Sequence, residues 1–103
     1  MFRRENIDML SIIPIDLKKV KKGDLDKEIL RAGIIAELDA INLYEQMANM
    51  TENTEIRKVL LEIAREEKTH VGEFQTLLTK NDEEYVKELR KGEEEVKELL
   101  QES

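Results

Sequence analysis

The sequence predicts an all-α fold, an antiparallel two-helix hairpin followed by a short C-terminal helix. The 103 residues include only four glycines and one proline, so residues that break helices are rare. Hydrophobic and charged residues each make up 40% of the chain, a balance typical of amphipathic helices rather than of disordered or membrane proteins. Apolar residues also recur at spacings of three and four in two long segments, which is the period of an α-helix.

The first long helix is predicted over residues 25–50. Asp24 or Asp26 would cap its N-terminus, and residues 1–24 before it are expected to be an extension or linker. The residues that set its helical period are Leu25, Ile29, Leu30, Ile34, Ile35, Leu38, Ile41, Leu43, Tyr44, Met47 and Ala48.

The second long helix is predicted over residues 54–79, with Thr51 or Thr54 as its cap. Only residues 51–53 connect the two predicted helices, so the helices should be antiparallel neighbours. The apolar residues of this second helix are Ile56, Val59, Leu60, Ile63, Ala64, Val71, Phe74, Leu77 and Leu78.

A third helix is predicted over residues 82–91, with Asn81 or Asp82 as its cap. Gly92 is expected to break this helix, and a helical pattern restarts over 93–101.

The expected organisation is an N-terminal extension (1–24), a helical hairpin (25–80) and a C-terminal helical segment (81–103). A helix of about 25 residues is roughly 37 Å long, so two of them make a thin hairpin with little interior. The apolar stripe of the first helix also extends over more than one side. We therefore expect a homodimer, in which two hairpins complete a four-helix bundle.

Composition excludes several functional classes. The net charge of −7 and the pI of about 4.8 argue against a nucleic-acid partner, which requires a basic surface. The chain has no cysteine, which excludes thiolate catalysis, disulfides and iron–sulfur clusters. No apolar run is long enough for a membrane span, and no signal sequence is evident, so a cytoplasmic location is expected.

Three polar residues occupy positions where a helix of this kind should present core residues. The residues one and two turns from Glu37 are all apolar, small or aromatic, namely Leu30, Gly33, Ile34, Ala40, Ile41 and Tyr44. The corresponding ring around Glu67 is apolar except for His70, the one histidine of the chain. A carboxylate on such a face needs a partner, and no lysine or arginine lies on either ring. The remaining partners are a proton or a metal ion.

The spacing of Glu67 and His70 presents a carboxylate oxygen and an imidazole nitrogen on one side of the second helix. Di-iron carboxylate bundles take a Glu from each of two helices and a Glu-x-x-His from each of the other two. With Glu37 from the first helix, this chain contains half of such a site, and a dimer would supply the rest. Oxygen-rich ligation with one imidazole per metal favours iron or manganese, and zinc less specifically.

The reaction we assign is the oxidation of Fe(II) to Fe(III) by dioxygen. Glu37 would bridge two irons, about one iron per chain, while Glu67 and His70 would bind terminally. Tyr44 lies two turns beyond Glu37 and either donates a hydrogen bond to a metal ligand or packs in the core. Asp39 either attracts cations as an accessory metal residue or is simply exposed. Three further glutamates of the second helix are interpreted as a solvated face, namely Glu62, Glu66 and Glu73.

Two blocks of sequence resemble the encapsulated ferritins, short ferritin-like proteins held inside encapsulin nanocompartments. The blocks are Ala36-Glu37-Leu38-Asp39-Ala40-Ile41-Asn42-Leu43-Tyr44 and Arg65-Glu66-Glu67-Lys68-Thr69-His70. The resemblance covers about residues 25–80 and is strongest to archaeal members, in which a similar domain can be fused ahead of the shell protein.

This resemblance implies a hairpin that dimerises around a di-iron ferroxidase centre, a ring of dimers that is commonly a decamer, and an encapsulin shell that holds the ferric product. By position, Glu37, Glu67 and His70 match the metal ligands, and Tyr44 matches a tyrosine beside them. Bacterial members have a further acidic site, and of its positions Asp39 keeps an acid, while Ala36 and Leu43 stand where those members have a glutamate and a tryptophan. No C-terminal encapsulation peptide is recognisable after Leu100, so we expect either a fusion to a shell or another route into it.

Two other functions fit the same residues. A rubrerythrin-like peroxide reductase would use the same kind of two-metal centre, although the cysteines of a rubredoxin domain are absent. A metal-free helical oligomerisation or interaction module would keep Glu37 and Glu67 protonated or exposed.

Overall fold

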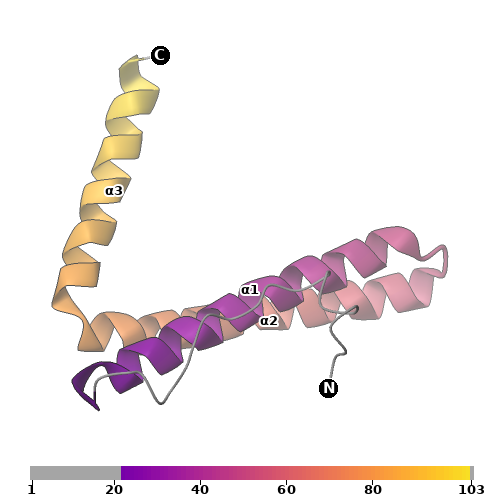
Figure 1. Cartoon of the computed structure of the whole chain (residues 1–103). Coiled ribbons are helices and arrows are strands. Elements are labelled where there is room, and N and C mark those ends of the chain that lie inside the picture. Colours follow the sequence, from indigo (N-terminus) through magenta and orange to yellow (C-terminus); the bar gives the residue numbers. More distant parts are fainter. Residues whose placement is uncertain (1–21, 103) are drawn as a thin grey trace, which may run out of the picture.

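The computed structural model describes residues 22–102 as a short 3-10 turn, η2 (Lys22–Asp24), followed by three α-helices. Helices α1 (Leu25–Met50) and α2 (Thr54–Asn81) lie antiparallel along their whole length, and α3 (Glu83–Glu102) turns sharply away from them (Figure 1). The all-α prediction, with a hairpin and a C-terminal helix, is confirmed. The N-terminal extension predicted for 1–24 lies almost wholly outside the described residues.

The turn between α1 and α2 is fixed by two side chains. Asn53 caps α2, because its side chain accepts hydrogen bonds from the amides of Glu55 and Ile56 at 3.0 and 3.1 Å. Arg57 donates to the carbonyls of Ala48 and Thr51, the end of α1, which would otherwise lack partners. The prediction of a threonine cap for α2 is therefore wrong, since the oxygen of Asn53 reaches both free amides.

Packing within the hairpin depends on small residues. Ala48 and Ala64 are fully buried, and Ile41 and Leu78 complete the set of buried apolar side chains among the described residues. Alanines let the two helix backbones approach closely, but they contribute little apolar area to a core. The hairpin therefore leaves many of its large apolar side chains exposed.

Gly33 of α1 and Phe74 of α2 lie close together. A Cβ atom added at Gly33 would lie 3.2 Å from two carbons of the Phe74 ring. The absence of a side chain at Gly33 thus makes room for the ring. This contact lies one turn from Glu37 and one turn from His70, so it borders the polar cluster.

Helix α3 begins at a buried aspartate. The Asp82 carboxylate accepts a hydrogen bond from the amide of Tyr85 at 3.0 Å and pairs with Arg31 of α1 at 3.4 Å. The predicted cap at Asn81 or Asp82 is thus confirmed for Asp82. The predicted break at Gly92 is wrong, because α3 is one continuous helix of 20 residues. The helix-forming Glu, Lys and Leu residues on both sides of Gly92 outweigh its cost of about 1 kcal/mol.

Within residues 22–102, no helix is both long and apolar enough to cross a membrane.

Candidate metal centre

Glu37, Glu67 and His70 meet midway along the hairpin, where α1 and α2 lie side by side. Nδ1 of His70 is 3.5 Å from Oε2 of Glu37 and 3.5 Å from Oε2 of Glu67. One potential ligand atom from each of the three residues lies within 4.8 Å of the other two. Glu67 and His70 project together because they are one helical turn apart, and the antiparallel packing supplies Glu37. A single ion between these atoms would have three protein ligands.

Burial makes this cluster unusual for acidic residues. The side chains of Glu37 and Glu67 are only 20% and 19% exposed, whereas that of His70 is 45% exposed. Oε2 of Glu37 is buried and has no hydrogen-bond partner. A distance of 3.5 Å to His70 is too long for a good hydrogen bond, so the charge of this oxygen is poorly compensated. A cation at the centre of the cluster would satisfy it.

The donor set also fits a hard or borderline metal. Two carboxylates and one imidazole are the ligand types that iron and manganese bind in proteins. The neighbouring Lys68 does not neutralise the carboxylates of the cluster, because its Nζ pairs with Glu45 of α1 at 2.9 Å. That ion pair links the two helices beside the cluster and leaves the cluster itself rich in negative charge.

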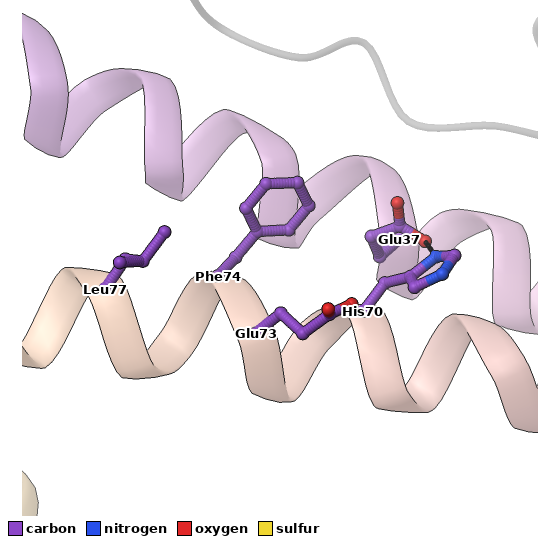
Figure 2. A pocket seen from close by; sticks show the side chains of 5 residues that line it. All are labelled: Glu37, His70, Glu73, Phe74 and Leu77. Carbon is purple, nitrogen blue, oxygen red and sulfur yellow. Dashed lines mark ion pairs between the residues drawn. The ribbon is translucent and has the colours of Figure 1, made fainter.

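A cavity of about 350 Å³ opens beside the cluster. Its lining consists of Glu37, His70, Glu73, Phe74 and Leu77, so it gives access to two of the three clustered residues (Figure 2). Glu73 was interpreted from the sequence as part of a solvated face, and it is indeed exposed, but it also faces this cavity. The spacing of three from Glu67 to His70 and again from His70 to Glu73 could have revealed it.

The structure does not place the two other predicted residues in the cluster. Tyr44 and Asp39 are both half-buried, and among the described residues neither lines the adjoining cavity. Asp39 is also not part of the group of three potential ligands. Glu62, by contrast, lies where the sequence suggested, on the exposed face of α2. Its hydrogen bond with Arg65 lowers the pKa of the Glu62 carboxyl and raises the pKa of the guanidinium.

Comparison with known proteins identifies the family. The rubrerythrin family model matches residues 28–102. The crystal structure of the encapsulated ferritin domain from Pyrococcus furiosus superposes with a TM-score of 0.75 at 59% sequence identity, covering 87% of this chain and 94% of that one. The chain belongs to the encapsulated ferritins, within the rubrerythrin family.

Two curated relatives extend this comparison. This chain is 58% identical over 93 residues to the ferritin-like–encapsulin shell fusion protein of Pyrococcus furiosus, covering 88% of the chain and 27% of that relative. It is 35% identical over 74 residues to the encapsulin nanocompartment cargo protein EncC of Myxococcus xanthus, covering 72% of the chain and 54% of that relative. The chain thus spans about a quarter of the first relative and about half of the second.

Proposed function

We propose that this encapsulated ferritin is a ferroxidase that oxidises Fe(II) with dioxygen at a di-iron centre shared between two chains. The observation that carries this proposal is the convergence of Glu37, Glu67 and His70 within 4.8 Å, with a buried carboxylate oxygen that lacks a partner. A proton would neutralise one carboxylate, but it would leave unexplained why an imidazole converges on the same point. A metal ion accounts for all three residues.

The proposed second chain follows from the apolar surface around the cluster. His70 belongs to a heptad series on α2 whose other members are Ile56, Ile63 and Leu77, and Ile56 and Leu77 are exposed. Residues at this spacing share one helix face, so His70 lies within an apolar stripe. A homodimer would cover the stripe and bring a second copy of the cluster opposite the first, which yields the four-helix bundle and ligand set of a di-iron protein.

In this proposal iron is the substrate, with about one Fe(II) per chain. Glu37, whose Oε2 atom is buried without a hydrogen-bond partner, would bridge the two ions, and Glu67 and His70 would each hold one ion terminally. Each Fe(II) gives up one electron, so a pair supplies the two electrons that reduce dioxygen to hydrogen peroxide with uptake of two protons. The surrounding carboxylates favour the more highly charged Fe(III) product. Asp39 and Tyr44 remain candidates for accessory roles, in attracting cations and in hydrogen bonding.

The open hairpin has no interior in which a mineral could form, so the ferric product must be stored elsewhere. Both curated relatives are named for their association with encapsulins, one as a shell fusion and the other as a cargo protein. We therefore place this chain inside an encapsulin nanocompartment of the cytoplasm, as a ring of dimers, with a decamer as the expected size. The shell would hold the iron that the ring oxidises.

Native mass spectrometry before and after anaerobic addition of Fe(II), followed by absorbance measurement of Fe(III) formation in air, tests the proposal. The expected result is an assembly with an even number of chains, about one iron per chain and rapid oxidation. Glu67→Gln and His70→Ala should lose both iron and activity. Glu66→Gln removes a neighbouring exposed charge and should retain both. An assembly that ignores iron would overturn the proposal and favour a metal-free interaction module.

The match to the rubrerythrin family favours a second candidate, a peroxide reductase that uses the same centre. The two candidates differ in the oxidant. Comparison of the rates at which equal concentrations of dioxygen and hydrogen peroxide oxidise the bound Fe(II) distinguishes them, and a clear preference for hydrogen peroxide would select the reductase.

A further inference from the structure

We propose that Glu73 is the residue through which Fe(II) reaches the cluster of Glu37, Glu67 and His70. This inference rests on the proposed function and adds a residue outside the predicted ligand set. Glu73 would hold an incoming ion at the cavity mouth and release it to His70 and Glu37.

Position is the first argument. Glu73 follows His70 by one turn on α2, so the two side chains project from neighbouring points of the same helix. Both line the cavity that also reaches Glu37. Figure 2 shows the Glu73 side chain extending along α2 in the direction of His70. An ion bound at Glu73 would therefore share a cavity with two residues of the cluster.

Charge is the second argument. Some glutamates of the hairpin have basic partners, as Glu62 has in Arg65 and Glu45 has in Lys68. In the described part of the chain, no lysine or arginine forms an ion pair with Glu73, and none lines its cavity. Glu73 is also exposed, whereas Glu37 is mostly buried. A free carboxylate at the exposed end of a cavity and a buried carboxylate at its inner end form a path for a cation.

The wall of the cavity is the third argument. Its remaining lining residues, Phe74 and Leu77, are apolar and offer no ligand to a metal ion. Leu77 also belongs to the stripe that the proposed dimer covers, so the partner chain would close that side of the cavity. Low-dielectric walls concentrate the field of the acidic residues along the cavity and raise the local concentration of cations. Phe74 packs against Gly33, so this wall is held by the hairpin itself. Within the cavity, an ion can then be bound only at the carboxylates and the imidazole.

Ligand number explains why the ion would move inward. A single exposed carboxylate binds a divalent ion weakly and releases it readily, whereas the cluster offers three ligand atoms within 4.8 Å. Glu73 should therefore control how fast iron arrives at low concentration, and not how much iron the centre holds at saturation.

The test compares the wild-type chain with Glu73→Gln, Glu73→Asp and the control Glu66→Gln. Glu66 and Glu73 are seven residues apart and exposed on the same edge of α2, but of the two only Glu73 lines the cavity. Two quantities are measured, the iron content at saturating anaerobic Fe(II) by native mass spectrometry and the initial oxidation rate as a function of Fe(II) concentration.

For Glu73→Gln we expect unchanged iron content and maximal rate, with a half-saturating Fe(II) concentration raised about threefold to tenfold, as for loss of one nearby charge. Glu73→Asp should remain close to the wild type, and Glu66→Gln should match it. Equal half-saturating concentrations in all four proteins would overturn the inference. Loss of bound iron in Glu73→Gln would also overturn it, because Glu73 would then be a ligand of the centre. If the wild type itself neither binds nor oxidises iron, the proposed function fails, and the inference fails with it.

Discussion

At the scale of single residues, the burial of the Glu37 carboxylate lowers the stability of the metal-free fold. Its Oε2 atom is buried without a hydrogen-bond partner, and the nearest basic group is an imidazole nitrogen at 3.5 Å. Leaving a buried acceptor unsatisfied costs about 1–3 kcal/mol. This cost supports the proposal that the carboxylate binds a ligand.

Replacement of Glu37 by Gln should therefore stabilise the metal-free protein while it weakens iron binding. The neutral amide is less costly to bury, and we expect a gain of about 1 kcal/mol. This gain corresponds to a rise in Tm of about 4–8 °C for a domain of this size. Differential scanning calorimetry in the presence of a chelator measures it, with Glu66→Gln as the control. A lower Tm for Glu37→Gln would show that the carboxylate is already paired in the metal-free state.

Gly33 should tolerate a side chain less well than another helical glycine. In Gly33→Ala the new methyl group would lie 3.2 Å from the Phe74 ring, whereas a Cβ at Gly72 meets nothing within 4 Å. Gly72→Ala should gain about 0.5–1 kcal/mol of helix stability. Gly33→Ala should lose that gain to overpacking, which costs about 1–3 kcal/mol. Urea unfolding of both variants checks the difference, and equal stabilisation would show that Phe74 moves aside freely.

At the scale of helices, specific polar side-chain contacts at the connections between helices fix how the helices are joined. Asn53 and Arg57 satisfy the free backbone groups at the turn between α1 and α2. Asp82 performs two tasks at the start of α3, because it caps that helix and pairs with Arg31 of α1. The direction of α3 is thus fixed by a polar contact to the hairpin and by the hydrogen bond from Tyr85 to Gln75.

Loss of the cap at Asn53 should destabilise the hairpin. Asn53→Ala removes the acceptor for the Glu55 and Ile56 amides and should cost about 1 kcal/mol. Asn53→Asp preserves an acceptor oxygen at the same place and should restore most of the stability. Thermal unfolding followed by circular dichroism measures both. If Asn53→Asp were as unstable as Asn53→Ala, the capping hydrogen bonds would not be the source of the effect.

Two substitutions of Asp82 separate its roles. Asp82→Asn retains an oxygen for the Tyr85 amide but removes the charge that faces Arg31. Asp82→Ala removes both and should cost about 1–2 kcal/mol, most of it from the lost cap. Because Arg31 is half exposed, the ion pair should contribute less than about 1 kcal/mol. Stability near that of wild type for Asp82→Asn, measured by urea unfolding, would agree with this division, and stability equal to that of Asp82→Ala would contradict it.

At the scale of the whole molecule, residues 22–102 form only a small apolar interior. The buried apolar side chains among the described residues are Ile41, Ala48, Ala64 and Leu78, and two of these are alanines. Many larger apolar residues are exposed along both long helices. An apolar surface of this extent is typical of an interface. The proposed dimer would supply the missing core and the missing ligands together.

A charge introduced into the apolar stripe should therefore dissociate the dimer. Val59 is 59% exposed and lies one turn from Ile56 and Ile63 of the stripe, whereas Leu61, at 47% exposed, lies on another side of α2. For Val59→Lys we expect smaller assemblies in sedimentation velocity and loss of bound iron, because the centre needs both chains. Leu61→Lys should retain the iron centre. Iron retained in a monomeric Val59→Lys protein would show that one chain suffices.

The sequence alone determined the helices and the candidate ligands. The bounds of α1 follow from its apolar period, and Glu37, Glu67 and His70 stand out because charged residues on an apolar face are costly. The sequence was a less reliable guide to where helices begin and end, because several neighbouring residues could cap or break a helix. Asn53 caps α2 although two threonines lie beside it, and α3 continues through Gly92.

The tertiary structure decided which side chains share a space. Glu66 and Glu73 both lie about one turn from His70 on α2, and packing against α1 creates the cavity that only Glu73 lines. Likewise, helical periodicity does not predict that Gly33 lies close to Phe74 or that Arg31 pairs with Asp82. Periodicity records the direction in which a side chain leaves its own helix. Contacts between helices depend on their relative register and rotation, which are set only when the helices pack.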